Sequence, residues 1–181
     1  MTNPSINFQD IKMLVMDVDG VLTDGGIIIG NKGELCKRFD VQDGMGISLA
    51  LRNDLKIALI TGRHSEILLR RAKELGITLI CERVTDKKEA LESLARENNL
   101  ELSQVAFMGD DLNDLPALNI AGLALAPLNA AIDVKKRAHY ITQKPGGFGA
   151  VREIIEIILR SRGLWDKIVA DYTAKGQGDK Q

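Results

Sequence analysis

Residues 13–24 read Met-Leu-Val-Met-Asp-Val-Asp-Gly-Val-Leu-Thr-Asp, an apolar run followed directly by two carboxylates spaced two residues apart. Such a run is typical of a strand buried inside a parallel sheet, and ligands of open α/β sheets bind beyond the carboxyl ends of the strands. Gly20 allows the chain to turn there. Carboxylates about 4 Å apart repel by roughly 4 kcal/mol at an effective dielectric of about 20. Asp17 and Asp19 therefore indicate a metal site, an acid/base pair, or both.

Apolar runs alternate with helical patterns along the rest of the chain. We expect strands at residues 13–17, 56–60, 78–81, 105–108 and 123–126. This order predicts an α/β fold with a doubly wound, parallel, Rossmann-like sheet. The clearest helix lies near the C-terminal end, where apolar residues recur at helical spacing before Gly163. Those residues are Val151, Ile154, Ile155, Ile158 and Leu159.

Residues 26–39 interrupt the alternation immediately after the carboxylate loop. Three isoleucines at 27–29 precede Gly30-Asn31-Lys32-Gly33, and a second short segment follows. A Gly/Asn turn between two such segments predicts a β-hairpin inserted after the first strand.

The composition restricts the class of partner. The chain has 181 residues, a formal net charge of −1 and a pI of about 6.1, so it lacks the basic balance that favours nucleic acid or anionic lipid. No apolar stretch approaches the length of a membrane span, and residues 1–10 do not resemble a secretion signal. Cys36 and Cys81 form no CxxC motif, so we expect reduced thiols. We expect a cytoplasmic protein that binds a small molecule, with no nucleic-acid or membrane partner.

Three more predicted strand ends carry polar groups suited to phosphoryl transfer. Thr61-Gly62-Arg63 offers a hydroxyl and a guanidinium at a helix start, where backbone N–H groups favour an anion. Asp86-Lys87-Lys88 opens another helix. Gly109-Asp110-Asp111-Leu112-Asn113-Asp114 supplies hard oxygen ligands of the kind that Mg²⁺ prefers.

The four segments DVDGVLTD, TGR, DK and GDDLND, in this order, resemble those of the haloacid dehalogenase superfamily. The resemblance implies phosphoryl transfer through an aspartyl phosphate. It implies that Asp17 is the nucleophile and Asp19 the general acid and base. It further implies that Thr61 donates to a phosphoryl oxygen and that Lys87 neutralises charge shared with Asp17. The cofactor implied is Mg²⁺, held by Asp17, the backbone carbonyl of Asp19 and Asp110, while Asp114 completes or orients the shell.

The spacing between motifs leaves no room for the cap domain that many superfamily members carry. The hairpin, one helix and one strand consume residues 25–60, and one helix and one strand consume residues 62–86. We therefore expect a capless phosphatase domain at 1–163, including the hairpin at 26–39, and a C-terminal tail at 164–181. In the tail, Leu164, Ile168, Val169 and Tyr172 can form one apolar helical face, which we expect to contact another subunit or to be mobile.

The hairpin, TGR, GDDLND, residues 43–47 and residues 146–153 resemble the 3-deoxy-D-manno-octulosonate 8-phosphate phosphatases. That family implies a homotetramer in which a glycine-rich C-terminal segment helps close a neighbouring site. It also implies an acidic eight-carbon sugar phosphate used in lipopolysaccharide synthesis. The GGxG pattern at 146–149 itself predicts a hinged tail. Arg63, with Gly62 and Arg83, is our candidate for substrate binding. Gln42 stands where the family pattern predicts arginine, and Glu82-Arg83 where it predicts glutamine and glycine.

Three other readings stay open at this point. A phosphatase for another sugar acid, such as a nonulosonate 9-phosphate, fits the same scaffold, although TGR disfavours it. A receiver-like phosphoacceptor domain also joins an aspartate, clustered acids, a hydroxyl and a lysine, but its phosphoacceptor stands without a second carboxylate two residues away. A non-catalytic oligomerisation module is the third alternative, and the complete set of four motifs disfavours it because such a module does not require them.

Overall fold

The sheet is parallel and has six strands in the order β5-β4-β1-β6-β7-β8. The computed structural model describes residues 7–31 and 33–175. The strands are β1 (Met13–Met16), β4 (Lys56–Ile60), β5 (Leu79–Cys81), β6 (Val105–Met108), β7 (Leu123–Ala126) and β8 (Tyr140–Ile141). The five predicted strands are confirmed to within one residue at their ends. The two-residue strand β8 was not predicted, because so short an edge strand carries no periodic signal.

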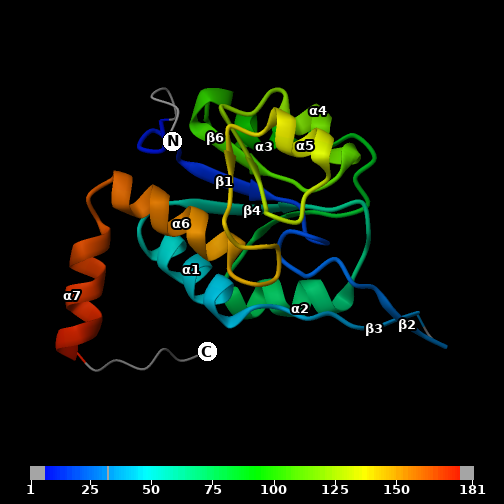
Figure 1. Cartoon of the computed structure of the whole chain (residues 1–181), viewed down its shortest axis with the longest axis horizontal. Helices are drawn as coiled ribbons and strands as arrows, with labels where there is room; N and C mark the ends of the chain where they lie inside the picture. Colours follow the sequence, from blue (N-terminus) through cyan, green and yellow to red (C-terminus); the bar gives the residue numbers. More distant parts are fainter. Residues whose placement is uncertain (1–6, 32, 176–181) are drawn as a thin grey trace.

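Helices cover both faces of this sheet (Figure 1). One layer contains α1 (Val41–Arg52), α2 (Glu66–Leu75), α6 (Ala150–Ser161) and α7 (Trp165–Lys175). The other contains α3 (Lys87–Glu97), α4 (Leu115–Leu118) and α5 (Ile132–Arg137), with the short 3₁₀ helices η1 (Leu102–Gln104) and η2 (Leu112–Asp114) in the connecting loops. The predicted doubly wound α/β class is confirmed, and the described residues contain no cap domain.

The core consists of two apolar clusters, one on each face of the sheet. Successive strand residues point to opposite faces, so Leu14 and Met16 of β1 join the cluster under α1, α2 and α6, whereas Met13 and Val15 join the cluster under α3, α4 and α5. All four side chains are fully buried. Burial on both faces explains why β1 is an uninterrupted apolar run rather than an alternating one.

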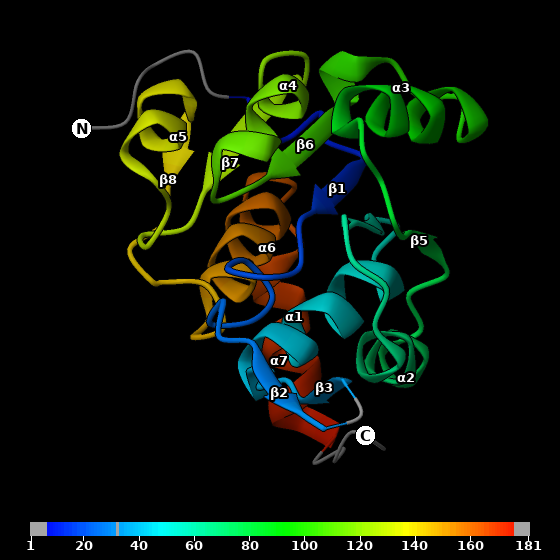
Figure 2. The same ribbon diagram turned by 90° about the vertical axis from the view of Figure 1, so that its right-hand side faces the viewer.

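The predicted hairpin forms a separate two-stranded antiparallel sheet of β2 (Ile28–Gly30) and β3 (Gly33–Cys36). Figure 1 shows it projecting from the body of the molecule, and in Figure 2 it lies below the carboxyl end of β1. Its apolar side chains face solvent in this single chain: Ile28 is 52% exposed, Ile29 72% and Leu35 66%. An exposed apolar group of this kind marks a surface suited to contact with another protein.

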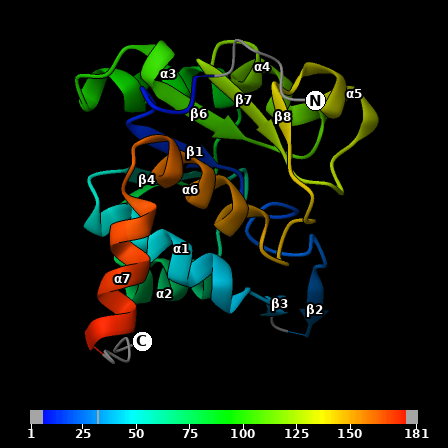
Figure 3. The same cartoon turned by 60° about the vertical axis from the view of Figure 1, so that its left-hand side comes forward.

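The helix beyond Gly163 packs at least partly on its own chain, which corrects our expectation for this segment. Figure 3 shows α7 running beside α6 and α1. Trp165 is buried in the core cluster, and Leu164, Ile168 and Tyr172 pack against it, whereas Val169 stays 47% exposed. The domain boundary at residue 163 remains a prediction, and residues 176–181 of the predicted tail lie outside the described residues.

The glycine-rich segment at 146–149 packs on the carboxylate loop of the same chain. The amide of Gly147 donates to the carbonyl of Val21 over 3.1 Å. A Cβ atom at Gly146 would lie 1.9 Å from the carbonyl oxygen of Gly20, so any side chain there would collide with backbone. Within one chain Gly146 and Gly147 serve close packing, and the hinge that we expect at 146–149 stays a prediction.

Among the described helices, none is both long and apolar enough to cross a membrane.

Candidate active site

The three central strands β4, β1 and β6 bring their carboxyl ends together at one edge of the sheet. Thr61, Asp17 and residues 109–110 follow these strands directly. The amide of Asp17 donates to the carbonyl of Met108 over 2.9 Å, which continues the β1–β6 pairing into the loops. A cavity of about 260 Å³ opens here, lined by Asp17, Asp19, Gly25, Thr61, Gly62, Arg63, Asp110, Asp111 and Asn113.

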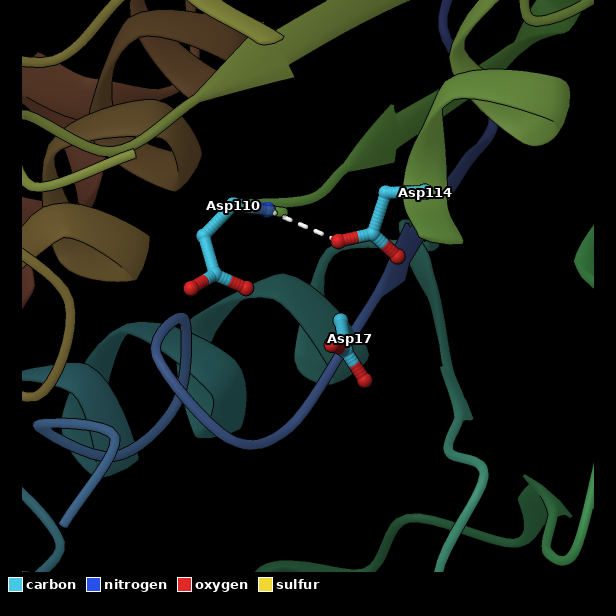
Figure 4. Close-up of side chains that lie close together, drawn as sticks. All are labelled: Asp17, Asp110 and Asp114. Carbon is cyan, nitrogen blue, oxygen red and sulfur yellow. Dashed lines mark hydrogen bonds between the residues drawn. The ribbon is translucent and has the colours of Figure 1, made fainter. Parts of the chain in front are cut away.

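Three carboxylates lie close together here (Figure 4), and two of them, Asp17 and Asp110, line the cavity. Asp17, Asp110 and Asp114 each offer an oxygen, and these oxygens lie within 4.8 Å of one another. Oδ1 of Asp110 is buried and has no hydrogen-bond partner among the described residues. A buried carboxylate oxygen without a donor is destabilising unless a cation meets it, so this group fits a hard divalent metal ion.

Asp114 differs from the other two carboxylates because both of its oxygens already have partners. Oδ2 accepts from the amides of Asp110 (2.8 Å) and Asp111 (3.1 Å), and Oδ1 accepts from Nζ of Lys87 at 2.6 Å. The side chain is fully buried. This arrangement suits a residue that orients a metal shell better than one that supplies a free oxygen to it.

The crowding of negative charge shifts the ionisation of this cluster. Burial, reinforced by the charge of Asp114, raises the pKa of Asp17 to about 6 although Lys87 opposes the shift. Burial, together with the charges of Asp17 and Asp114, raises the pKa of Asp110 to about 7. Burial disfavours the Lys87 ammonium, yet Asp17 and Asp114 outweigh this effect and raise the Lys87 pKa. The cluster therefore needs an added cation to be fully ionised near neutral pH.

Gly20 is required by a close approach as well as by the turn. Its φ is +93°, and a Cβ atom there would lie 2.0 Å from Oδ2 of Asp110. Glycine therefore allows the first loop to pass beside the second acidic loop.

Thr61 and Gly62 form the wall of the cavity opposite the acidic loop. Thr61 is buried, its amide donates to the carbonyl of Cys81, and its hydroxyl accepts from the amide of Arg63 at 3.2 Å. Gly62 is exposed to the cavity. The side chain of Arg63 is 48% exposed, and its Nε lies 3.8 Å from Oδ2 of Asp19.

Sequence reasoning missed a second cation beside Asp19. Nζ of Lys37, the residue after β3, donates to Oδ1 of Asp19 and lies 2.9 Å from Oε1 of Glu34. Burial disfavours the Lys37 ammonium, but the hydrogen bonds to Asp19 and Glu34 outweigh it, so the Lys37 pKa is raised. No local pattern marks Lys37, because the contact depends on how the hairpin folds back on a loop 18 residues earlier.

The comparisons with known proteins agree with this geometry. The family model for haloacid dehalogenase-like hydrolases matches residues 76–155. The 3-deoxy-D-manno-octulosonate 8-phosphate phosphatase KdsC of Escherichia coli is 40% identical over 169 residues, which cover 93% of this chain and 87% of that enzyme. The chain belongs to the 3-deoxy-D-manno-octulosonate 8-phosphate phosphatase family.

Solved structures of this family have the same fold. The Moraxella catarrhalis phosphatase, in complex with a magnesium ion, a phosphate ion and a KDO molecule, is 42% identical. Its TM-score is 0.88, and the match covers 91% of this chain and 95% of that one. The cobalt-bound form of the Haemophilus influenzae phosphatase is 38% identical with a TM-score of 0.85, covering 87% and 92% of the two chains. The nonulosonate, receiver-like and non-catalytic readings are not favoured.

The structure shows the surroundings of two residues that depart from the family pattern, Arg83 and Glu82. Arg83 has a φ of +56°, a left-handed conformation that glycine adopts without strain, and glycine is the residue that the pattern predicts there. Its side chain is exposed and does not line the cavity, unlike Arg63 and Gly62. Glu82 accepts from the amide of Ser65 at 3.1 Å and lies 3.1 Å from Nδ1 of His64. Glu82 and His64 therefore lie at the N-terminal end of α2, the helix that follows Thr61-Gly62-Arg63.

Proposed function

We propose that this protein hydrolyses 3-deoxy-D-manno-octulosonate 8-phosphate to the free sugar acid and inorganic phosphate, a reaction of lipopolysaccharide synthesis. The observation that carries the proposal is that residues of three motifs line one cavity at the carboxyl ends of β4, β1 and β6, while Lys87 of the fourth motif pairs with Asp17. The identity to the KdsC phosphatases over nearly the whole chain supports the choice of substrate. We place the enzyme in the cytoplasm.

Asp17 is the proposed nucleophile. One of its oxygens attacks phosphorus while the bond between phosphorus and the sugar oxygen breaks, leaving an aspartyl phosphate. Asp19 donates a proton to the departing sugar oxygen. Asp19 then accepts a proton from water, whose oxygen attacks phosphorus, and the bond to Asp17 breaks to release phosphate. Burial of Asp17 beside Lys87 favours the first step, because the ammonium group offsets the charge that the phosphoryl group brings.

Asp17, the backbone carbonyl of Asp19 and Asp110 would hold Mg²⁺, with Asp114 orienting the shell. The unpartnered buried oxygen of Asp110 supports this assignment. When bound, the ion neutralises negative charge on the phosphoryl oxygens and on the carboxylates. Thr61 donates its hydroxyl proton to a phosphoryl oxygen from the opposite wall of the cavity.

Arg63 is the proposed partner of the substrate carboxylate, with the backbone of Gly62 beside it. Both line the cavity, and Arg63 keeps part of its guanidinium free because its contact with Asp19 is long, at 3.8 Å. Arg83 is a weaker candidate within one chain because its side chain lies outside the cavity.

We further propose that the protein is a homotetramer assembled through the hairpin. The exposed side chains of Ile28, Ile29 and Leu35 support this assembly, since a neighbouring hairpin would remove them from water. The open cavity also needs closure from outside the chain, because no cap domain lies within the described residues.

A phosphate-release screen tests the substrate assignment. The panel contains 3-deoxy-D-manno-octulosonate 8-phosphate, a nonulosonate 9-phosphate and hexose phosphates, each with Mg²⁺ and with EDTA. We expect the eight-carbon substrate to give the highest kcat/KM, and only with Mg²⁺. A higher kcat/KM for the nonulosonate phosphate would transfer the assignment to that substrate.

A further inference from the structure

The hairpin delivers a buried cation to the proposed acid/base residue. An isolated antiparallel bridge between Thr23 and Phe39 fastens the base of the hairpin to the end of the carboxylate loop. Lys37, inside this connection, has a side chain only 1% exposed, and its Nζ reaches Oδ1 of Asp19. A lysine ammonium is rarely so buried unless it is paired, so this contact is part of the fold and not a chance surface ion pair.

Glu34 fixes the position of Lys37 from the other side. Its Oε1 lies 2.9 Å from Nζ of Lys37, while its Oε2 accepts from the hydroxyl of Ser65. Ser65 in turn caps α2, because its Oγ accepts from the amide of Leu68 at 3.2 Å. The hairpin is thereby tied to the helix that follows Thr61-Gly62-Arg63, and Lys37 is held between two carboxylates.

The two oxygens of Asp19 consequently have different surroundings. Oδ1 accepts from the buried Lys37, whereas the long contact of Oδ2 to the half-exposed Arg63 is its only polar side-chain contact within residues 7–31 and 33–175. Asp19 lines the cavity with Asp17 and Asp110, and without an anchor its carboxylate would turn away from these like charges. Anchoring one oxygen fixes the direction of the other, and proton transfer requires such a fixed geometry.

We propose that Lys37 is a positioning residue, which anchors Oδ1 of Asp19 so that Oδ2 faces the leaving oxygen of the substrate. The inference rests on the proposed phosphatase chemistry but not on the identity of the sugar. Lys37 itself does not touch the reacting atoms. Its effect is therefore confined to steps in which Asp19 moves a proton.

Aryl phosphates with leaving oxygens of different basicity test this role without the sugar substrate. A strongly basic leaving oxygen needs a proton as it departs, whereas p-nitrophenolate leaves without one. We expect Lys37→Met to lower kcat/KM by about tenfold on phenyl phosphate and by less than about threefold on p-nitrophenyl phosphate. The tenfold loss is part of the rate enhancement that a correctly positioned general acid contributes. Asp19→Asn should likewise make kcat/KM fall more steeply as the leaving oxygen becomes more basic.

Two further variants separate positioning from a structural effect. In the Asp19→Asn background, Lys37→Met should cause no additional loss on phenyl phosphate, because the group that it positions is already absent. Lys37→Arg keeps a cation at this position, so its kcat/KM should depend on leaving-group basicity much as that of the wild type does. The matched control is Lys56→Met, since Lys56 is an exposed lysine at the opposite end of β4 and should leave both substrates unaffected.

Equal losses on the two aryl phosphates, or an additive loss in the Asp19→Asn background, would overturn the proposal. If Lys37→Met does not fold, Lys37→Gln takes its place in the same comparison. Failure of the sugar assignment is a separate outcome: the wild type would then hydrolyse aryl phosphates but not 3-deoxy-D-manno-octulosonate 8-phosphate, and the aryl comparison would still decide the role of Lys37.

Discussion

Nζ of Lys87 lies 3.0 Å from Oδ2 of Asp17, and both side chains are buried. Asp17 follows β1 and Lys87 begins α3, so the contact joins the central strand to the helix layer on one face of the sheet. The same ammonium lies 2.6 Å from Asp114. One buried cation thus serves two buried carboxylates, and its removal has consequences for both stability and chemistry.

Lys87→Met should lower kcat by about 10² to 10³-fold, because a preorganised charge beside the phosphoryl group is lost. It should also lower the free energy of unfolding in Mg²⁺-free buffer by about 3 to 5 kcal/mol, since two buried carboxylates lose their partner. Steady-state kinetics and urea denaturation measure the two effects. The control is Lys88→Met, whose exposed side chain lies on the same first turn. A Lys87 variant with wild-type kcat would remove this residue from the proposed machinery.

Arg63→Ala should weaken the preference for the sugar acid phosphate over a hexose phosphate. Because Arg63 is 48% exposed, we expect a loss near 2 kcal/mol, the lower end for a charge pair that is desolvated in the complex. The ratio of kcat/KM values for the two substrates measures it, with Arg70→Ala on the exposed face of α2 as the control. If the ratio is unchanged in Arg63→Ala, the carboxylate partner must be another cation, with Arg83 the next to replace.

Mg²⁺ affinity should fall as the pH is lowered from 8 to 5.5, by more than about tenfold. The metal needs ionised carboxylates, and the pKa values of Asp17 and Asp110 are about 6 and about 7 in the metal-free protein. Both pKa values lie above 3.8, the ordinary value for an aspartate, so the folded protein binds these protons more tightly than the unfolded chain does. The free energy of unfolding of the metal-free protein should therefore fall as the pH rises from about 4 through 7. Calorimetric titration in buffers of different ionisation enthalpy should detect proton release on binding. Affinity independent of pH over this range would contradict the charge crowding described here.

Ile29→Asp should convert the proposed tetramer into smaller species. Ile29 is 72% exposed in the single chain, so the change costs the isolated subunit little, whereas a charge buried between hairpins is strongly unfavourable. Sedimentation velocity at several concentrations measures the change. Val169→Asp, also at an exposed apolar residue but on α7, is the matched control. A wild-type protein that sediments as a monomer would refute assembly through the hairpin.

Most of the fold could be predicted because the decisive signals are local. Apolar runs mark the central strands, and the polar residues that follow Met16, Ile60 and Met108 gather at one edge because parallel neighbouring strands end together. The α/β order and the hairpin follow from the same kind of short-range pattern.

Contacts that depend on long-range packing could not be predicted. The burial of Trp165 against its own core depends on how α7 returns along α6, and the contact of Gly146 with Gly20 joins segments more than a hundred residues apart. The Lys37–Asp19 pair belongs to the same class. The sequence shows whether each of these residues is charged or apolar, but it does not show which distant residue each one contacts in the fold.

The most direct test of the account is phosphate release from 3-deoxy-D-manno-octulosonate 8-phosphate by the wild type and by Asp17→Asn, with Mg²⁺ and with EDTA. The account predicts rapid release by the wild type with Mg²⁺, loss of release with EDTA that returned Mg²⁺ reverses, and no release above background by a folded Asp17→Asn protein. Asparagine is neither a nucleophile nor an anionic ligand, so both proposed roles disappear together. Normal release by Asp17→Asn, or none by the wild type with Mg²⁺, would contradict it.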